Sequence, residues 1–269
     1  MAFSRGFVLI SAVAVCSVVS LPLAADEIED FFAARGTWET VTDPNVGPGG
    51  DFTIFTPAEP GQGGFEHPVI TWGNGTFASP DDYFELLDHF ASHGFVVIAS
   101  NSGFVGSGVQ MIDGAEWVLE QNDNPDSPLF GNIDVDSVGA TGHSQGGGGT
   151  INAGNDPRIT CLAPLQGTAG DIKGINGPLF TMAGETDFIV PWESVAEDHF
   201  IPSEVPSIFG VLAGSGHGEP NGDAGRYRGY TTAWFAACLM EDEFARGAFV
   251  GDCSLCQNEN WLVMRKSGE

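Results

Sequence analysis

The chain has 269 residues and a strongly acidic composition, with 36 Asp and Glu residues against 9 Lys and Arg, which gives a formal net charge of −27. A surface of that charge repels nucleic acid and anionic membranes, so we expect neither nucleic-acid binding nor stable membrane association. Hydrophobic residues make up 42% of the chain, which is enough to bury a sizeable core and argues against a disordered protein.

Residues 1–25 have the order of charge and apolarity that is typical of a secretory signal peptide. Arg5 precedes an apolar run over residues 7–19, and small residues at 24 and 25 precede an acidic segment. The apolar run is too short for a comfortable membrane span. We therefore predict export to the periplasm or the medium, removal of residues 1–25, and a single domain over residues 26–269.

The rest of the chain alternates between strand-like and helix-like segments. Short apolar runs bounded by turn residues predict strands, and apolar residues at helical spacing predict helices. Strands are expected at 51–56, 67–72, 95–99, 137–140, 159–165, 178–182 and 208–212, and helices at 79–93, 110–120, 145–153, 191–199 and 225–240. This alternation predicts an α/β fold with a mostly parallel central sheet and helices on both faces.

The segment around Ser144 carries the strongest functional signal. Residues 142–146 read Gly-His-Ser-Gln-Gly and fit the G-x-S-x-G nucleophile elbow, in which a serine sits on a tight turn between a strand and a helix. The pentapeptide alone is weak evidence in a chain with 38 glycines, but a predicted strand precedes it and a predicted helix follows it. We predict Ser144 as a catalytic nucleophile; the alternative is a Gly-rich loop with an incidental serine.

A nucleophilic serine needs a base and an orienting acid, which in this arrangement follow the serine in chain order. Only two histidines follow Ser144. His217 lies in a Gly-rich loop just after a predicted strand, where the base belongs, whereas His199 lies in a predicted helix. We therefore predict His217 as the base.

Two carboxylates compete for the role of the acid. Glu185 and Asp187 both follow the predicted strand at 178–182. We favour Asp187 because it lies nearer to the start of the next helix, and Glu185 remains the alternative.

The negative charge that develops on the substrate oxygen needs backbone N–H donors, which form an oxyanion hole. One donor should be the amide of Gln145, directly after the nucleophile. The second should come from the loop after the strand at 67–72, with Asn74 as the first choice and Gly75 as the next. His143, beside the nucleophile, is expected to pack beneath the turn rather than to take part in chemistry.

Four cysteines follow the signal peptide, and an even number in an exported chain favours disulfides over metal or redox chemistry. The sequence does not choose among the three possible pairings. We expect the C-terminal tail to be tied to the body through a disulfide and Cys161 to be a free core cysteine. The four residues are Cys161, Cys238, Cys253 and Cys256.

Together these motifs resemble those of the secreted cutinase and polyester-hydrolase (PET-hydrolase-like) branch of the α/β-hydrolases, close to the dienelactone-hydrolase-like esterases. The resemblance covers about residues 68–240 and rests on HGFVVI at 93–98, GHSQGGGGT at 142–150, DFIVP at 187–191, and Gly216-His217 followed by Pro220-Asn221. It implies an α/β-hydrolase fold without a large lid and ester hydrolysis through an acyl-enzyme. It also implies chemistry without a metal or other cofactor, and an exposed cleft for hydrophobic acyl groups or polyesters.

Two departures from this family make the expected cleft less aromatic. The family usually has a tyrosine after the glycine of the first oxyanion loop, where this chain has Asn74, and a tryptophan where this chain has Leu165 or Gln166. These changes put activity on aromatic polyesters in doubt, but not activity on simple esters. The residues expected to line the cleft are Gly75, Gln166, Phe188 and Trp192, with Phe77 and Phe104 as further aromatic candidates.

The leading hypothesis from the sequence is a secreted, monomeric serine esterase that acts on an ester or polyester. An acyltransferase or carbohydrate deacetylase on the same scaffold would have the same groups around the serine. A hydrolase fold that has lost activity and serves as a binding module is the alternative from another class, although such a module would not need to retain Ser144, Asp187 and His217.

The charge also predicts a response to salt. Without Arg5, the only charged residue in the predicted signal peptide, 8 basic and 36 acidic residues would remain, and the only lysines are Lys173 and Lys266. Such a composition suggests a salt-rich habitat, because salt screens the repulsion between acidic side chains. The midpoint of thermal unfolding should therefore rise with sodium chloride concentration, and a midpoint that stays flat from low to high salt would contradict this prediction.

Overall fold

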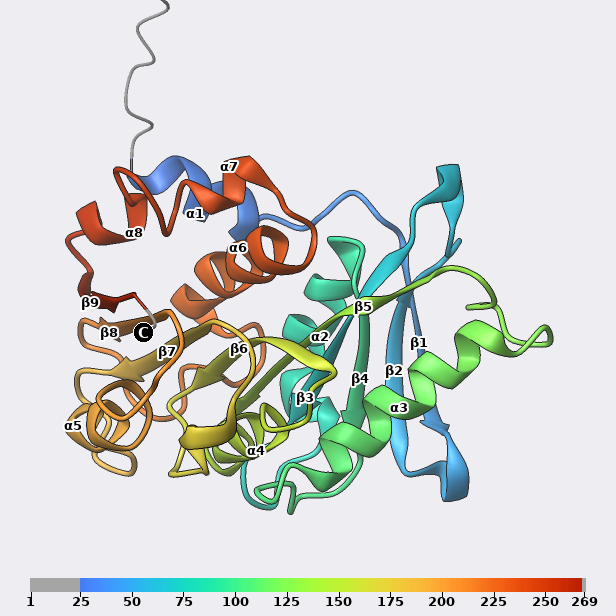
Figure 1. Cartoon of the computed structure of the whole chain (residues 1–269), viewed down its shortest axis with the longest axis horizontal. Coiled ribbons are helices and arrows are strands. Elements are labelled where there is room, and N and C mark those ends of the chain that lie inside the picture. Colours follow the sequence, from blue (N-terminus) through green and yellow to red (C-terminus); the bar gives the residue numbers. More distant parts are fainter. Residues whose placement is uncertain (1–24, 268–269) are drawn as a thin grey trace, which may run out of the picture.

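A computed structural model describes residues 25–267, so the predicted signal peptide lies outside the described residues except for Ala25. Within that range the chain forms one nine-stranded sheet with helices on both faces (Figure 1). The strands lie side by side in the order β1-β2-β4-β3-β5-β6-β7-β8-β9. Their bounds are β1 Thr40–Val46, β2 Phe52–Pro57, β3 His67–Gly73, β4 Val96–Ser100, β5 Ile133–His143, β6 Ile159–Leu165, β7 Leu179–Gly184, β8 Ser207–Leu212 and β9 Trp261–Lys266.

The six central strands are parallel, and the outer strands are antiparallel to their neighbours. Strands β4, β3, β5, β6, β7 and β8 run in one direction, whereas β2 pairs antiparallel with β4, and β9 antiparallel with β8. Every residue of β3, β4, β7 and β8 is buried, as expected for parallel strands that are covered on both faces. Continuous apolar runs therefore mark the centre of this sheet.

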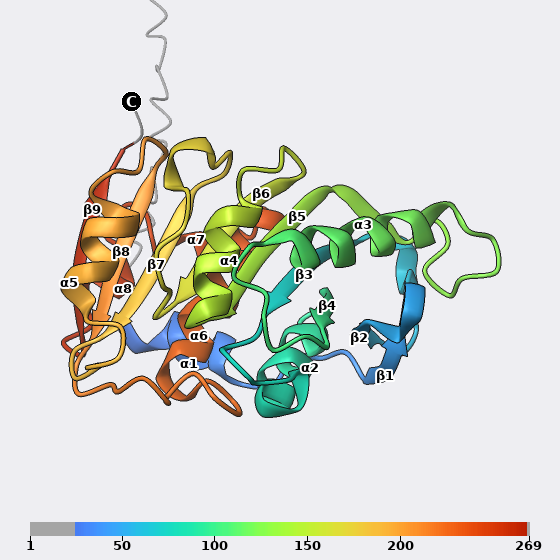
Figure 2. The same ribbon diagram turned by 90° about the horizontal axis from the view of Figure 1, so that it is seen from below.

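The helices form two layers on opposite sides of the sheet (Figure 2), and a separate hydrophobic core lies between the sheet and each layer. Helices α1, α2 and α6 pack on one face, and α3 and α4 on the other. A third, smaller cluster lies under α5. The helices are α1 Ala25–Ala33, α2 Phe84–Ser92, α3 Val109–Asp123, α4 Gln145–Ala153, α5 Trp192–Val195, α6 Arg228–Leu239, α7 Glu243–Arg246 and α8 Ser254–Gln257.

This architecture is that of an α/β-hydrolase, and the predicted fold class is confirmed. The predicted strands and helices all occur, with ends shifted by a few residues. The sequence analysis did not identify α1, β1, α7, α8 or β9. Strand β1 contains Asp43, Pro44 and Asn45, which are typical of turns, and it is accommodated because it lies at the edge of the sheet.

The expectation of disulfides is confirmed, but the expectations of a free Cys161 and of a disulfide between the tail and the body were wrong. Cys161 is not free, because it is bonded to Cys238 and so links β6 to α6. Cys253 is bonded to Cys256, which closes a short loop within the tail and does not tie the tail to the body. The tail is held instead by the pairing of β9 with β8.

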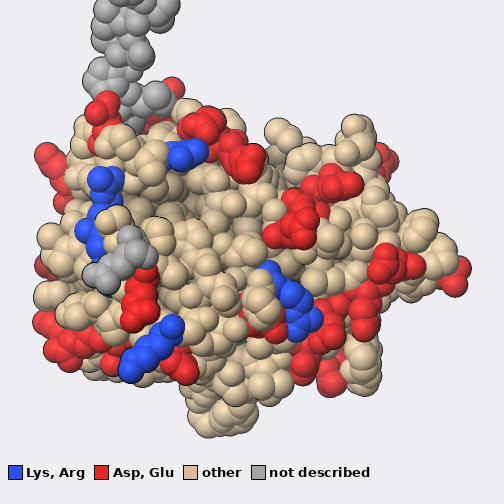
Figure 3. Space-filling model, in the orientation of Figure 1, with Lys and Arg blue, Asp and Glu red and all other residues tan. Residues whose placement is uncertain are grey.

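Acidic side chains are spread over the face of the molecule seen in Figure 3, where basic side chains occur only in small groups. Several of the arginines are already paired with nearby carboxylates, such as Arg226 with Glu219 and Arg228 with Asp223. Within residues 25–267, no helix combines the length and apolarity that a membrane span requires.

Buried histidines are a second electrostatic feature of the fold. Burial lowers the pKa of five of them, to about 3 for His89 and about 4 for His143. At His67 the hydrogen bonds add to the effect of burial: its Nδ1–H donates to Gly94 O at 2.6 Å, and its Nε2 accepts from the amide of Gly61 at 3.1 Å. A second proton would break the bond from Gly61. The five are His67, His89, His93, His143 and His199.

These histidines predict a loss of stability in weak acid. The unfolded chain takes up their protons near a pKa of about 6.5, whereas the folded chain does not until the pH approaches the lowered pKa values. The free energy of unfolding should therefore be highest above about pH 6.5 and decrease as the pH falls below it. Denaturant unfolding in high salt, which screens the acidic surface, would measure this. His89→Asn should reduce the slope, and an unfolding free energy that does not fall between about pH 7.5 and pH 5.5 would contradict the prediction.

Candidate active site

The turn that carries Ser144 joins the end of β5 to the start of α4. Ser144 has a left-handed backbone with φ 56° and is only partly buried. Such a conformation is unusual for serine and is typical of a strained functional turn. The turn also needs glycine, since a Cβ added at Gly146 would lie 1.9 Å from the carbonyl oxygen of Gly73 on β3. Helix α4 can therefore start against β3 only with glycine at this position.

A chain of hydrogen bonds connects Ser144, His217 and Asp187. His217 Nε2 lies 2.9 Å from Ser144 Oγ, and His217 Nδ1 lies 2.7 Å from Asp187 Oδ2. Because an ionised carboxylate can only accept, Nδ1–H donates to Asp187, and Nε2 is left to accept from the serine hydroxyl. The structure thus brings together the three residues predicted as nucleophile, base and acid.

The structure also distinguishes Asp187 from Glu185. The Asp187 side chain has no solvent exposure, and its second oxygen, Oδ1, accepts from the amides of Ile189 at 2.8 Å and Val190 at 2.9 Å. The carboxylate is therefore fixed in position. Glu185 is exposed and accepts from the amide of Gly214, which anchors the His217 loop without contacting the histidine.

Gln145, the predicted first oxyanion donor, is the first residue of α4 and directly follows Ser144. Among the described residues its backbone N–H has no protein acceptor, as is usual for the first turn of a helix. Its side chain connects two loops: Oε1 accepts from the amides of Val105 and Gly106, and Nε2 donates to Thr76 Oγ1 at 3.2 Å. The loop after β3 is thereby held next to the nucleophile.

Asn74, the predicted second donor, lies beneath the site rather than in it. The residue has no solvent exposure, and its side chain accepts from Trp72 Nε1 and donates to the carbonyls of Ser100 and Ser102. Gly75 is also buried, and its amide donates to the Tyr83 hydroxyl at 3.1 Å. A substrate at Ser144 could reach neither residue, so both assignments have to be corrected.

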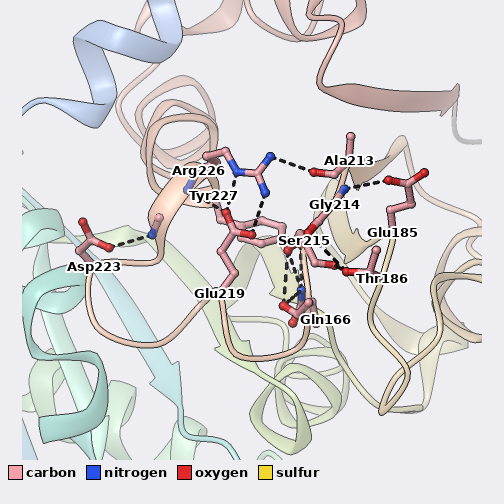
Figure 4. A network of polar contacts seen from close by, with 12 residues as sticks. Gln166, Glu185, Thr186, Ala213, Gly214, Ser215, Glu219, Asp223, Arg226 and Tyr227 are labelled. Atoms are coloured by element: carbon pink, nitrogen blue, oxygen red, sulfur yellow. Dashed lines mark hydrogen bonds and ion pairs between the residues drawn. The ribbon is translucent and has the colours of Figure 1, made fainter.

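Gln166 is a further correction, because it is fully buried and does not line a cleft. Figure 4 shows its side chain directed at the loop that precedes and includes His217. Gln166 Nε2 donates to Gly216 O at 3.0 Å and to Tyr227 OH at 2.9 Å. The chain turns at this residue, where φ is 47°, and the side chain therefore points inward.

Two exposed residues next to Ser144 were not predicted from the sequence as site residues. The amide of Thr168 donates to Ser144 O at 3.0 Å, two positions after Gln166. Thr76 is the first exposed residue after β3, and among the described residues its amide has no protein acceptor. The predicted residues, Asn74 and Gln166, come directly after their strands, whereas the exposed residues lie two positions further along the chain. The length of each loop was the signal that could have indicated this.

The aromatic candidates differ in exposure. Phe188 is 87% exposed, next to Asp187, whereas Trp192 packs against the cluster under α5 and so has a structural role. Phe77 and Phe104 are 82% and 57% exposed, and their rings meet edge to face with centroids 5.1 Å apart. Two apolar surfaces are therefore exposed, one following the Thr76 loop and one following Asp187.

A cavity of about 950 Å³ lies elsewhere, at the opposite ends of the parallel strands. Thr160, Ser207 and Cys238 are among its lining residues, and none of the predicted site residues is. Ligands of such sheets bind beyond the carboxyl ends of the strands, which is where Ser144 lies. The candidate active site is therefore the region around Ser144 and not this cavity.

Comparison with known proteins agrees with this geometry. A family profile described as PET hydrolase-like matches residues 27–259. The bis(hydroxyethyl) terephthalate hydrolase of Streptomyces coelicolor is 27% identical over 203 residues, which cover 72% of this chain and 63% of that protein. Cutinase est1 of Thermobifida alba is 28% identical over 167 residues, 58% of this chain and 55% of that protein. Chlorophyllase-1 of Citrus sinensis is 32% identical over 155 residues, 52% of this chain and 45% of that protein.

The matched regions thus cover less than two thirds of each of these relatives, whereas the family profile covers most of the chain. The profile spans the nucleophile turn, both candidate carboxylates and His217. The chain belongs to the PET hydrolase-like family.

Proposed function

We propose that this chain is an exported serine esterase that hydrolyses carboxylic esters through an acyl-enzyme. The observation that carries the proposal is the continuous hydrogen-bonded chain from Ser144 through His217 to Asp187, at 2.9 Å and 2.7 Å. The named activities of two relatives, a terephthalate-ester hydrolase and a cutinase, support the same reaction class. Export is supported by the signal-like sequence of residues 1–25.

In the first half of the reaction Ser144 Oγ attacks the carbonyl carbon of the ester while His217 Nε2 takes the hydroxyl proton. Asp187 holds the imidazole in the required tautomer and stabilises its positive charge. The bond to the leaving alcohol then breaks, and His217 gives its proton to the departing oxygen. Water repeats the sequence on the acyl-enzyme, which releases the acid and restores Ser144.

The developing oxyanion would be held by two backbone donors, the amide of Gln145 and the amide of Thr76 in place of Asn74. Both amides lack a protein acceptor among the described residues, and the Gln145 side chain bonds to Thr76 Oγ1. Donors that are held in place before the reaction stabilise the transition state without reorganisation. The polar side chain of Gln145 thus holds the two proposed donors next to each other.

The substrate class follows from the exposed apolar surface. Phe188, which follows Asp187, and the Phe77–Phe104 pair, which follows Thr76, offer aromatic contact to a hydrophobic acyl or aryl group. The chain has no charged side chain among Thr76, Phe77, Thr168 and Phe188, so we propose uncharged esters, including polyester chain ends, as substrates.

Hydrolysis of a p-nitrophenyl ester series from acetate to decanoate tests the proposal. Wild type should hydrolyse the series, and Ser144→Ala should lower kcat by about 10⁵-fold or more, because the reaction then lacks its nucleophile. An acceptor alcohol added to the same assay would reveal an acyltransferase by diverting product from the free acid. A wild type that neither hydrolyses these esters nor reacts with a serine-directed phosphonate would refute the proposal and favour a binding module.

The two carboxylates after β7 provide a matched pair of variants. Asp187→Asn should lower kcat by roughly 10³–10⁴-fold, because the amide favours the wrong tautomer of His217. Glu185→Gln should have a far smaller effect, since Glu185 does not contact the histidine. Both variants keep the shape of the side chain, so circular dichroism should confirm an intact fold in each. The reverse order of effects would reassign the acid.

A further inference from the structure

We propose that four buried residues beneath Ser144, namely Tyr83, His143, Gln166 and Tyr227, form a polar bridge that fixes the His217 loop relative to the loop of the oxyanion donors. We call them the buried bridge. The inference deepens the proposed function, because it identifies positioning residues for that same site. None of the four is more than 4% exposed, so their polar atoms have to find partners within the protein.

The bridge begins at the loop after β3. The amide of Gly75 donates to the Tyr83 hydroxyl at 3.1 Å, and this hydroxyl lies 3.0 Å from His143 Nδ1. A Cβ added at Gly75 would lie 2.8 Å from the Tyr83 oxygen and 3.8 Å from Ser144 Cβ. The Tyr83 hydroxyl therefore supports the backbone directly before Thr76.

The surroundings of His143 determine where its proton lies. The Tyr83 hydroxyl accepts from Gly75, so its own proton is available to His143 Nδ1. His143 Nε2 is buried, and the Gln166 side chain and the His217 carbonyl lie close enough to influence the pKa of His143. Burial, the largest effect, lowers this pKa to about 4, so the ring is neutral. Because the Tyr83 hydroxyl donates to Nδ1, the proton of the neutral ring belongs on Nε2.

Gln166 connects His143 to the His217 loop. Its Nε2 lies within hydrogen-bond distance of Tyr227 OH at 2.9 Å, Gly216 O at 3.0 Å and Ser215 Oγ at 3.2 Å, so both hydrogens of the NH₂ group are committed on this side and Oε1 is turned away from it. Gln166 Oε1 and His143 Nε2 are both buried without a hydrogen bond of standard geometry to any described residue. They complement each other as acceptor and donor, and each needs a partner within the protein because both are buried, so the buried bridge pairs them.

Tyr227 completes the bridge at the far side of the loop. Its hydroxyl lies 2.9 Å from Ser215 Oγ and accepts from Gln166 (Figure 4). The same loop is anchored on its outer side by Arg226, which donates to Ala213 O and pairs with Glu219. The His143 and His217 rings are 4.7 Å apart, so a shift of the bridge would move the base directly.

The tautomer of His143 tests the bridge without any substrate. Long-range proton–nitrogen correlation spectra of the ¹⁵N-labelled protein at about pH 7.5 should show His143 as the neutral Nε2–H form, with the signal assigned from its loss in His143→Gln. In Gln166→Met, which removes the acceptor for Nε2–H, the Nδ1–H form should appear, because Nδ1–H can donate to the Tyr83 hydroxyl. A wild-type His143 that is protonated on Nδ1, or a tautomer that Gln166→Met leaves unchanged, would overturn the proposal.

Coupled kinetics test whether the bridge positions the site. Tyr83→Phe and Tyr227→Phe should each lower kcat by roughly 10-fold with little change in KM, because each removes the two hydrogen bonds of one hydroxyl and leaves the cleft intact. The double variant should be about as slow as the slower single variant, because both changes break the same bridge. Tyr230→Phe is the matched control: its hydroxyl is buried near Asn258, away from the site, and its kcat should equal that of wild type.

Effects of the two single variants that multiply in the double variant would mean two independent packing defects and would overturn the bridge. A loss of activity in Tyr230→Phe equal to that in Tyr83→Phe would do the same. If wild type hydrolyses no ester, the proposed function fails by itself; the rate of phosphonate labelling of Ser144 then replaces kcat in the same comparison, and the His143 tautomer is read as before.

Discussion

The site depends on the close approach of two backbones. Helix α4 begins so near to the end of β3 that only glycine fits at residue 146, where a Cβ would lie 1.9 Å from Gly73 O. This contact raises Ser144 above the sheet in a left-handed conformation and brings the Thr76 loop beside it. The nucleophile and the candidate oxyanion donors are therefore positioned by main-chain geometry, which no rearrangement of side chains can replace.

The loop that carries His217 is stabilised differently. It contains Gly214, Gly216 and Gly218, whose backbone entropy opposes a single conformation. Polar contacts hold it on both sides: Thr186 donates to Ser215 O, Arg226 donates to Ala213 O, and Gln166 donates to Gly216 O. A flexible segment is thus ordered by directional bonds from rigid neighbours, which is how a loop can present a base within hydrogen-bond distance of the nucleophile.

Chain order and periodicity were sufficient to predict the seven inner strands of the sheet, the elbow and the residues that meet around Ser144. They did not predict the direction in which individual loop side chains point. Asn74 and Gln166 follow buried strands, yet both side chains point inward, and the exposed positions are Thr76 and Thr168. Loop residues have no fixed periodicity, so sequence alone cannot say which of several consecutive residues faces the solvent. Strand β9 was missed for a related reason: it forms by pairing with the edge of β8, and such a tertiary contact cannot be read from the local sequence.

Phe77 combines two features that both work against stability. Its backbone is left-handed, with φ 64°, and its ring is 82% exposed. A bulky residue in that conformation costs on the order of 1 kcal/mol, and the edge contact with Phe104 returns a comparable amount at most. Glycine would relieve the strain and asparagine would tolerate it. Folding stability alone therefore does not account for a phenylalanine at this position, which is consistent with the substrate contact proposed for the Phe77–Phe104 pair.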